Sequence, residues 1–559
     1  MNLRGVGVSP GIGHGPAYIL TTHVPEPPEG ATYAGEADQE KERAVSALAQ
    51  VAGELESRGD RAGGEAREIL KAQALMAEDP GLVVKIRAYI DRGLAAQRAV
   101  YEGFTKYRDV LAGVGGYLGE RAADLDDVRD RVIAVLTGQV LPGLPAPGAE
   151  PYVLVAHDLA PADTALLSRT SVAAFVTEEG GPTSHTAIMA RALGVPAVVA
   201  CAGATRLEPG VQVLVDGTSG EVRAQPTESD VAEAESEASA RLAAISRIQG
   251  PGRTSDGFPV PLLANIGGPG DLEAALEAGA EGVGLFRTEF LYLGRRHPPQ
   301  AQEQEDAYRA VLTAFPGGQV VVRTLDAGAD KPLAFLPPEA PEPNPALGER
   351  GLRLFRRHPE VMEAQLDALA TAAVGTSAEL SVMAPMVSTA EEAEWFAEAC
   401  RAADLPRAGV MIEVPAAALR AQSLLAEVDF VSVGTNDLAQ YCFAADRELG
   451  ALGELQNPWQ PALLDLVAMA ASEAADAGKP CGVCGEAAAD PALACVLTGL
   501  GAATLSMTPA ALPAVRAALA THTLEQCRLA AQAARAAPTA VLARQEARAH
   551  LPELASLGL

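Results

Sequence analysis

The chain has 559 residues, which is too long for one compact core and predicts about two to four domains. Its formal net charge of −29 argues against general nucleic-acid binding, and suits a soluble protein or one that attracts a basic partner. The chain contains no apolar run of roughly 18 residues, so we expect no membrane insertion. Its seven scattered cysteines favour a reducing, cytoplasmic setting over a disulfide scaffold.

The first part of the chain predicts an α/β domain that is interrupted by helices. Residues 34–140 are rich in Ala, Glu, Arg and Leu, and their apolar positions recur at helical spacing, which predicts a helical bundle. Strand-like runs lie on both sides of it, at residues 16–20, 152–156, 172–177, 195–200 and 211–216. We therefore expect residues 1–22 and 143–226 to form one domain, and residues 23–142 to form an inserted helical domain.

The second part of the chain alternates regularly between strands and helices. A charged helix is predicted over residues 227–247, within a linker of residues 227–253. Apolar strands then follow at residues 261–265, 282–286, 320–323, 381–386, 409–413, 430–433, 480–483 and 504–507. Strands that alternate with helices over about 300 residues are typical of a (β/α)8 barrel. The predicted fold is therefore multidomain α/β, with this barrel over residues 254–559.

One histidine has a setting that suits nucleophilic chemistry. A Gly-Gly pair follows a predicted strand, and Thr183 or Ser184 can cap a helix that starts near His185. Free backbone N–H groups and the helix dipole favour an anion there, and a neutral imidazole is a good nucleophile toward phosphorus. A single histidine is more often structural or on the surface, but the other seven histidines have no comparable setting.

Polar side chains stand where the predicted barrel strands end. Active sites of (β/α)8 barrels are built from the carboxyl ends of the strands, so these side chains should converge on one face. They are Arg287 and Glu289, Arg323 and Asp326, Glu413, Asn436 and Asp437, and Cys484 and Glu486. Taken singly, such residues often form structural ion pairs. Cys481 and Cys484 could instead form half of a metal site or a redox pair.

The segment around His185, Gly-Gly-Pro-Thr-Ser-His-Thr-Ala-Ile-Met-Ala-Arg-Ala, resembles the signature of the phosphohistidine swivelling domain. Enzyme I of the bacterial sugar phosphotransferase system, phosphoenolpyruvate synthase and pyruvate phosphate dikinase share that domain. Thr164 matches a threonine that these families place near the histidine. The second half of the chain resembles their phosphoenolpyruvate-binding barrel, in residues 285–290, 323–326, 344–348, 434–438, 445–447 and 484–486.

The order of the domains separates these families. A swivelling domain that precedes the barrel is similar to Enzyme I, whereas the two larger relatives need an additional ATP-grasp domain, for which no long segment is left over. The resemblance implies a phosphoenolpyruvate–protein phosphotransferase, which passes a phosphoryl group from phosphoenolpyruvate to His185. A histidine of a small phosphocarrier protein then receives the group, which starts sugar uptake. The resemblance also implies that the helical domain docks the phosphocarrier and that the barrels form a homodimer.

Several arginines suit the substrate that this resemblance implies. Phosphoenolpyruvate carries a phosphate and a carboxylate, and the planar guanidinium groups of Arg287, Arg323 and Arg447 can bind both. The resemblance places Asn436 and Asp437 among the substrate-binding residues as well. It gives supporting roles to Thr164 and Arg350.

A metal ion and a proton donor complete the expected chemistry. Mg²⁺ prefers oxygen ligands and usually takes one or two carboxylates together with substrate oxygens, which Glu413 and Asp437 fit. Loss of the phosphoryl group leaves the enolate of pyruvate, which needs a proton at carbon. The thiol of Cys484 is the candidate donor.

Three positions depart from the pattern of Enzyme I. Glu349 stands where a bulky residue is usual, Gln73 where a histidine is frequent, and Pro182 where an arginine is common. None of them removes a catalytic group, and they bear on fine tuning and on partner contacts. Two other functions stay open. One is that of the nitrogen-regulatory paralogue of Enzyme I, which usually carries an additional N-terminal sensory domain. The other is a regulatory binding protein without turnover, against which the joint presence of His185 and the barrel residues argues.

Overall fold

The computed structural model describes residues 2–9, 11–20, 24, 26–62, 64–114, 122–139, 151–157, 159, 171–180, 185–293, 295, 297–328, 331–336, 340, 342–446 and 452–559. The chain divides into two compact units, Met1–Glu235 and Ser236–Leu559. Each unit has hydrophobic cores of its own.

The first unit contains a mixed sheet of eight strands in the order β1-β8-β7-β3-β4-β5-β6-β2. They are β1 (Asn2–Arg4), β2 (Val6–Ser9), β3 (Ile12–Leu20), β4 (Tyr152–Ala156), β5 (Val172–Thr177), β6 (Ala197–Val199), β7 (Gln212–Asp216) and β8 (Glu221–Ala224). The strands β3 to β6 are parallel neighbours. In β4, Val153 packs on one face and Leu154 on the other, so every residue of the strand is buried. This pattern is typical of a strand that is covered on both faces.

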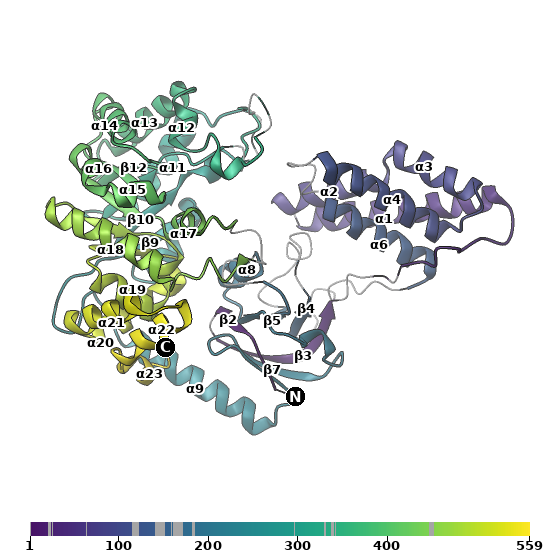
Figure 1. The fold of residues 1–559 in the computed structure, drawn as a ribbon, viewed down its shortest axis with the longest axis horizontal. Helices are drawn as coiled ribbons and strands as arrows, with labels where there is room; N and C mark the ends of the chain where they lie inside the picture. The colour runs from purple at the N-terminus through teal and green to yellow at the C-terminus, as the bar shows by residue number, and fades with distance from the viewer. Residues whose placement is uncertain are drawn as a thin grey trace. The chain divides into compact units, whose positions relative to one another are not determined.

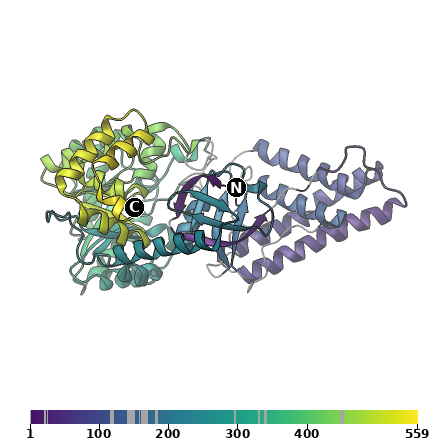
Figure 2. The same cartoon turned by 90° about the horizontal axis from the view of Figure 1, so that it is seen from below.

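A helical bundle lies in sequence between β3 and β4, as the composition predicts. Its helices are α1 (Ala37–Ala62), α2 (Gly64–Ala77), α3 (Pro80–Asp91), α4 (Ala96–Val114) and α6 (Ala122–Thr137), and they lie side by side (Figures 1 and 2). Leu48, Phe104 and Val128 belong to its separate core. The start of α3 follows local rules, because the carboxylate of Asp79 accepts the N–H of Leu82 at 2.8 Å and a proline follows it.

One helix, α9 (Glu228–Ser246), joins the sheet to the second part of the chain, which confirms the predicted charged helix. Most of its side chains face solvent. Near its carboxyl end, Ile245 is buried against Ala517 and Leu557. The end of α9 is therefore anchored to the barrel unit by apolar contacts.

The second unit is a closed barrel in which all neighbouring strands are parallel (Figure 1). Its strands are β9 (Leu262–Ile266), β10 (Gly282–Arg287), β11 (Gln319–Arg323), β12 (Glu379–Ala384), β13 (Ala408–Ile412), β14 (Phe430–Val433), β15 (Cys481–Val483) and β16 (Thr504–Met507). Every predicted strand is present. The largest difference is in β12, which ends two residues before the predicted limit because Met386 has a positive φ of 59° that ends the extended backbone.

Helices cover the outside of the barrel. They are α10 (Leu272–Glu277), α11 (Ala301–Ala314), α12 (Leu352–Phe355), α13 (Pro359–Ala373), α14 (Ala390–Ala402), α15 (Pro415–Leu419), α16 (Ala421–Glu427), α17 (Thr435–Phe443), α18 (Pro461–Asp476), α19 (Pro491–Gly499), α20 (Leu512–Thr521), α21 (Leu524–Ala536), α22 (Ala540–Ala549) and α23 (Glu553–Ser556). Among the described helices, none is long and apolar enough to cross a membrane.

Along the barrel strands, side chains that pack in the outer core alternate with side chains that face the interior of the barrel. In β11, Val320 and Val322 point outward into the large core beneath the helices, while Val321 points inward. Arg323 lies at the carboxyl end of the same strand, on the inward face. Since successive side chains of a strand point to opposite faces, the strand ends can deliver polar groups to the mouth of the barrel without disturbing the outer core.

Candidate active site

His185 is the first residue of α8 (His185–Leu193), which follows the turn after β5. The helix packs on the sheet through Ala187 and Ala190, which belong to the same core as Leu154 and Phe175. The backbone therefore places His185 at a helix N-terminus, where free N–H groups and the dipole favour an anion. Four residues that were predicted to lie near this histidine are outside the described residues: Thr164, Pro182, Thr183 and Ser184.

The turn that leads toward α8 is held by side-chain hydrogen bonds. The hydroxyl of Thr177, at the end of β5, donates to the carbonyl of Glu179 at 2.7 Å. The carboxylate of Glu178 accepts the backbone N–H of Thr205 at 3.1 Å and its hydroxyl at 2.8 Å. These bonds fix the geometry of the chain at the end of β5, which precedes His185 in the sequence.

The barrel brings most of the predicted polar residues to one mouth, at the carboxyl ends of its strands. Arg287 and Arg323 end β10 and β11, Glu413 follows β13 directly, Asn436 and Asp437 lie in the first turn of α17, and Cys484 follows β15 directly. Arg447 lies outside the described residues.

A buried network of ion pairs organises this mouth. Two nitrogens of Arg350 donate to the two carboxylate oxygens of Asp326, each at 2.9 Å, and a third bond of 2.9 Å joins Arg350 to Asp437. Nζ of Lys331 also lies 3.0 Å from a carboxylate oxygen of Asp326 and forms an ion pair with it. Burial alone would raise the pKa of Asp326. The positive charges of Arg323, Lys331 and Arg350 outweigh burial and hold this pKa well below its usual range. Arg350, predicted to support the site, is thus its buried centre.

The two arginines that end neighbouring strands differ in their surroundings. Arg323 is buried and forms ion pairs with Glu289 and, at 3.3 Å, with Asp326. Arg287 is only half-buried, and it makes no hydrogen bond or ion pair within the described part of the chain. Arg287 therefore keeps all its donors for a ligand, whereas Arg323 is already oriented by carboxylates.

Glu413 is the buried carboxylate that the sequence assigned to a metal. One of its oxygens accepts the backbone N–H of Met386 at 2.6 Å, and the other is buried without a hydrogen-bond partner among the described residues. Burial, together with the negative charges of Asp437 and Asp326, raises the pKa of Glu413 to about 8. Such an oxygen beside a second carboxylate fits a bound cation, which would offset its charge.

A magnesium ion at this place would use Glu413 and Asp437. No group of three or more His, Cys, Asp or Glu side chains in the described ranges has the arrangement of a complete metal site. Two carboxylates with the remaining positions left to water or substrate oxygens are nevertheless what Mg²⁺ usually takes in phosphate-binding enzymes. The donor set therefore fits Mg²⁺ bound together with a phosphorylated substrate.

Cys484 is buried inside the barrel with Met383 and Met411, and its Sγ lies 3.5 Å from the carbonyl oxygen of Val433. Burial raises the pKa of its thiol, although a hydrogen bond from Ser432 acts in the opposite direction. The group is therefore a protonated thiol at neutral pH, as a proton donor must be.

Cys481 belongs to the outer core, so it lies on the opposite face of the barrel wall from Cys484. Both cysteines are free. The alternative of a paired redox or metal site is therefore wrong for these two cysteines.

Unsatisfied polar atoms mark where a ligand would sit. Buried atoms that lack a hydrogen-bond partner among the described residues include Nε of Arg323, Oε2 of Glu289, Oε2 of Glu413 and Oγ1 of Thr435. Such groups cost free energy in an empty site, so their concentration at one mouth indicates a place built for a charged ligand and a cation.

Sequence reasoning missed several residues that position this site. Asn265, at the end of β9, donates its amide to the carbonyl of Cys484 at 2.9 Å. Gln365 reaches in from α13 and accepts the N–H of Leu325 at 3.0 Å. Asn265 could have been found, because it lies near the carboxyl end of a predicted barrel strand. Gln365 could not, because it lies within a helix whose pattern predicts only packing.

Two of the departures from Enzyme I lie among the described residues. Gln73 is buried within the helical bundle. Glu349 forms a partly exposed ion pair of 2.8 Å with Arg357. Glu349 directly precedes Arg350 in the chain, and its backbone N–H donates to the carboxylate of Glu342 at 3.2 Å.

Comparison with known proteins covers nearly the whole chain. Residues 4–121, 148–220 and 243–524 match the models of the N-terminal, mobile and phosphoenolpyruvate-binding domains of PEP-utilising enzymes. The phosphoenolpyruvate-protein phosphotransferase of Streptomyces coelicolor is 59% identical over 551 residues, which cover 98% of this chain and 99% of the relative. Proteins of the same name from Haloferax volcanii and Bacillus subtilis are 41% and 39% identical, over 93% and 90% of this chain and 94% and 92% of their own lengths.

These matches agree with the strand-end chemistry of the barrel and with the position of His185 at the start of α8. The chain therefore belongs to the phosphoenolpyruvate-protein phosphotransferases, a family of phosphotransferase enzymes.

Proposed function

We propose that this protein transfers the phosphoryl group of phosphoenolpyruvate to His185 in a reaction that requires Mg²⁺, and then to a histidine of a small phosphocarrier protein that serves sugar uptake. The observation that carries this proposal is the barrel mouth, where unsatisfied buried atoms of Arg323 and Glu413 lie with the buried thiol of Cys484. These groups offer an anion site, a cation site and a proton source at the ends of β11, β13 and β15, which are alternate strands of the barrel.

The substrate-binding step uses the difference between the two arginines. Arg287 has no protein partner among the described residues, so it can close on the phosphate or the carboxylate of phosphoenolpyruvate. Arg323, held by Glu289 and Asp326, offers its remaining donor from a fixed position. Mg²⁺, held by Glu413 and Asp437, would neutralise charge on the phosphate oxygens when bound.

In the chemical step, a ring nitrogen of His185 forms a bond to phosphorus while the bond from phosphorus to the enol oxygen breaks. The electron pair stays on the enolate of pyruvate. Cys484 gives its proton to the methylene carbon, which yields pyruvate and a thiolate that must regain a proton from solvent. The helix N-terminus at His185 then stabilises the phosphoryl oxygens through backbone N–H groups.

The test is incubation of the full chain with radiolabelled phosphoenolpyruvate, with and without Mg²⁺. We expect label that is acid-labile and base-stable, that depends on Mg²⁺, and that is lost in His185→Ala. His550→Ala, which changes a histidine at the end of α22, is the matched control and should label normally. Absence of label in the unchanged protein would refute the proposal. It would support the alternative of a binding protein without turnover. Label that persists in His185→Ala would refute the site.

The acceptor and the assembly are tested separately. Addition of a small histidine-containing phosphocarrier protein should remove the label from His185 and transfer it to the carrier. The resemblance to Enzyme I supports docking of that carrier on α1 to α6, a homodimer through the barrels, and a cytoplasmic location. Sedimentation of the full chain at rising concentration should show a dimer, and a monomer at every concentration would refute the assembly.

A further inference from the structure

The interior of the barrel contains a second space, lined by both apolar and polar side chains, at the end opposite the candidate active site. Gln319, Phe430 and Thr504 are the first residues of β11, β14 and β16, and they line it together with Arg407, which precedes β13. The active-site residues lie at the other ends of these strands. This space, which we call the floor cavity, is therefore separate from the substrate mouth.

Small residues create the floor cavity. Barrel interiors are usually filled by layers of branched side chains, but Gly284, Gly482, Ser432 and Ser506 stand on inward positions here. A Cβ on Gly482 would lie 2.7 Å from Oγ1 of Thr504. The cavity has an interior volume of about 70 Å³. That volume is about half of the roughly 150 Å³ that takes up benzene in an engineered cavity, so phosphoenolpyruvate, which has more non-hydrogen atoms than benzene, is too large for it.

Among the residues that line the floor cavity, Arg407 supplies the charge, which is positive. Arg407 is half-buried, and its guanidinium lies 5.9 Å from the centre of the Phe430 ring. It forms no ion pair with any described residue. None of the 13 residues that line the cavity is acidic, although the chain has 72 acidic residues against 43 basic ones. An unpaired arginine in a partly desolvated space is an unusual feature in so acidic a protein.

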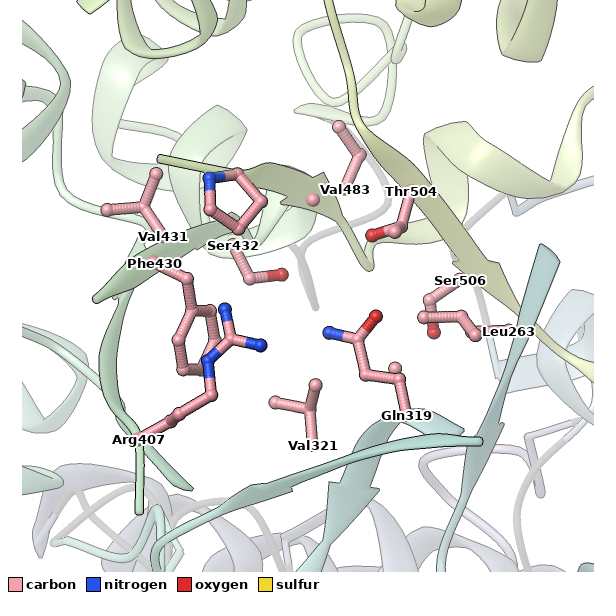
Figure 3. Close-up of a pocket in the computed structure, with 13 residues that line it drawn as sticks. Leu263, Gln319, Val321, Arg407, Phe430, Val431, Ser432, Val483, Thr504 and Ser506 are labelled. Atoms are coloured by element: carbon pink, nitrogen blue, oxygen red, sulfur yellow. The ribbon is translucent and has the colours of Figure 1, made fainter. Parts of the chain in front are cut away.

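Further donors point into the same space. Figure 3 shows the side chains of Arg407, Gln319 and Thr504 directed toward one another across the cavity. No hydrogen bond of the Gln319 amide or the Thr504 hydroxyl is formed with another described residue. A guanidinium, an amide and a hydroxyl around a small volume without a carboxylate are suited to an anion.

We propose that the floor cavity binds a small anion, either a carboxylate such as acetate or inorganic phosphate, with Arg407 as its counter-charge. The site is distinct from the site for phosphoenolpyruvate and does not depend on the proposed phosphoryl transfer.

The floor cavity is connected to Cys484 by hydrogen bonds. The hydroxyl of Ser506 bonds to the side-chain carbonyl of Asn265, whose amide donates to the backbone carbonyl of Cys484 at 2.9 Å. Ser432, which also lines the cavity, bonds to the thiol itself. An anion in the cavity is thus one residue away from the proton donor of the active site.

Calorimetric titration of the full chain with acetate, and separately with inorganic phosphate, tests the proposal. We expect binding that weakens at least about tenfold in Arg407→Met, which corresponds to roughly 1.4 kcal/mol. The anion that binds more tightly identifies the ligand class. Arg287→Met, which alters the substrate mouth, and Arg401→Met, which removes an exposed arginine of α14, should keep this binding event.

A second variant guards against a change in folding. Gly482→Ala keeps Arg407 but puts a methyl group into the cavity, 3.6 Å from Oγ of Ser432 and closer to Thr504, and should weaken the same event. Failure of both anions to bind the unchanged protein, or equal binding to Arg407→Met, would overturn the proposal. Labelling of His185 is a separate measurement, so loss of one result leaves the other intact.

Discussion

At the carboxyl ends of the barrel strands, Arg350 and Asp326 are fully buried and are joined by two bonds of 2.9 Å, whereas at the amino ends Arg407 is half-buried and pairs with no described carboxylate. Buried charges are tolerated only when their partners are in place, so the bonds of Arg350 to Asp326 and Asp437 must form before any substrate arrives. An uncompensated cation at the other end can instead take its partner from solution. The same barrel thus contains one preorganised charge system and one open one.

Removal of Arg350 from the preorganised ion pairs should have the largest effect on stability and on activity. Arg350→Met leaves Asp326 and Asp437 without their shared partner in a buried place, so we expect the free energy of unfolding to fall by about 3–5 kcal/mol. Phosphorylation of His185 should be lost as well. Denaturant unfolding of the variant measures the first effect. A loss no larger than that of a surface substitution would show that the network does not stabilise the barrel.

Loss of the thiol should slow the reaction without unfolding the protein. In Cys484→Ala, pyruvate formation should fall by a factor on the order of 10² to 10⁴, because a general acid is removed. Cys481→Ala, on the outer face of the same strand, is the matched control and should retain turnover. Release of pyruvate, measured by a coupled assay, distinguishes the two. Unchanged turnover in Cys484→Ala would refute its role as proton donor.

The pH dependence of stability should report on Glu413. The pKa of this carboxyl rises from 4.5 to about 8 on folding, so its favourable contribution is complete below about pH 4.5 and is lost as the pH rises through about 8. In the protein without Mg²⁺, the melting temperature should therefore decline over this interval, and less so in Glu413→Gln. Added Mg²⁺ should reduce the decline. Identical pH profiles for the two proteins would contradict the burial of an unpaired carboxylate here.

The smallest effect is expected at Glu349, one of the departures from Enzyme I. Its ion pair with Arg357 is partly exposed, so Glu349→Ala should change the free energy of unfolding by about 0–1 kcal/mol. Chemical denaturation measures this change, with Arg357→Ala as the matched partner variant. A loss as large as that for Arg350→Met would mean that the exposed pair belongs to the buried network.

Much of the fold could be predicted from the chain alone. Periodicity placed the eight strands and the inserted helices, because apolar alternation and helical spacing are local properties of a sequence. The positions of Arg287, Glu413 and Cys484 at one mouth followed from their places after predicted strands. Their pairing could not be predicted, since which guanidinium meets which carboxylate depends on distances between strands far apart in the sequence.

The sequence by itself determined the barrel, the helical bundle and the place of His185 at the start of α8, because each depends on a local pattern or motif. Only the tertiary structure decided that Arg350 is the buried centre of the ion pairs while Arg287 has no hydrogen-bond or ion-pair partner among the described residues, and that Cys481 and Cys484 face opposite ways. It also decided that small inward residues leave room beside Arg407. The physical reason is that burial and pairing of charge are properties of the closed barrel, in which eight separate strands are brought together.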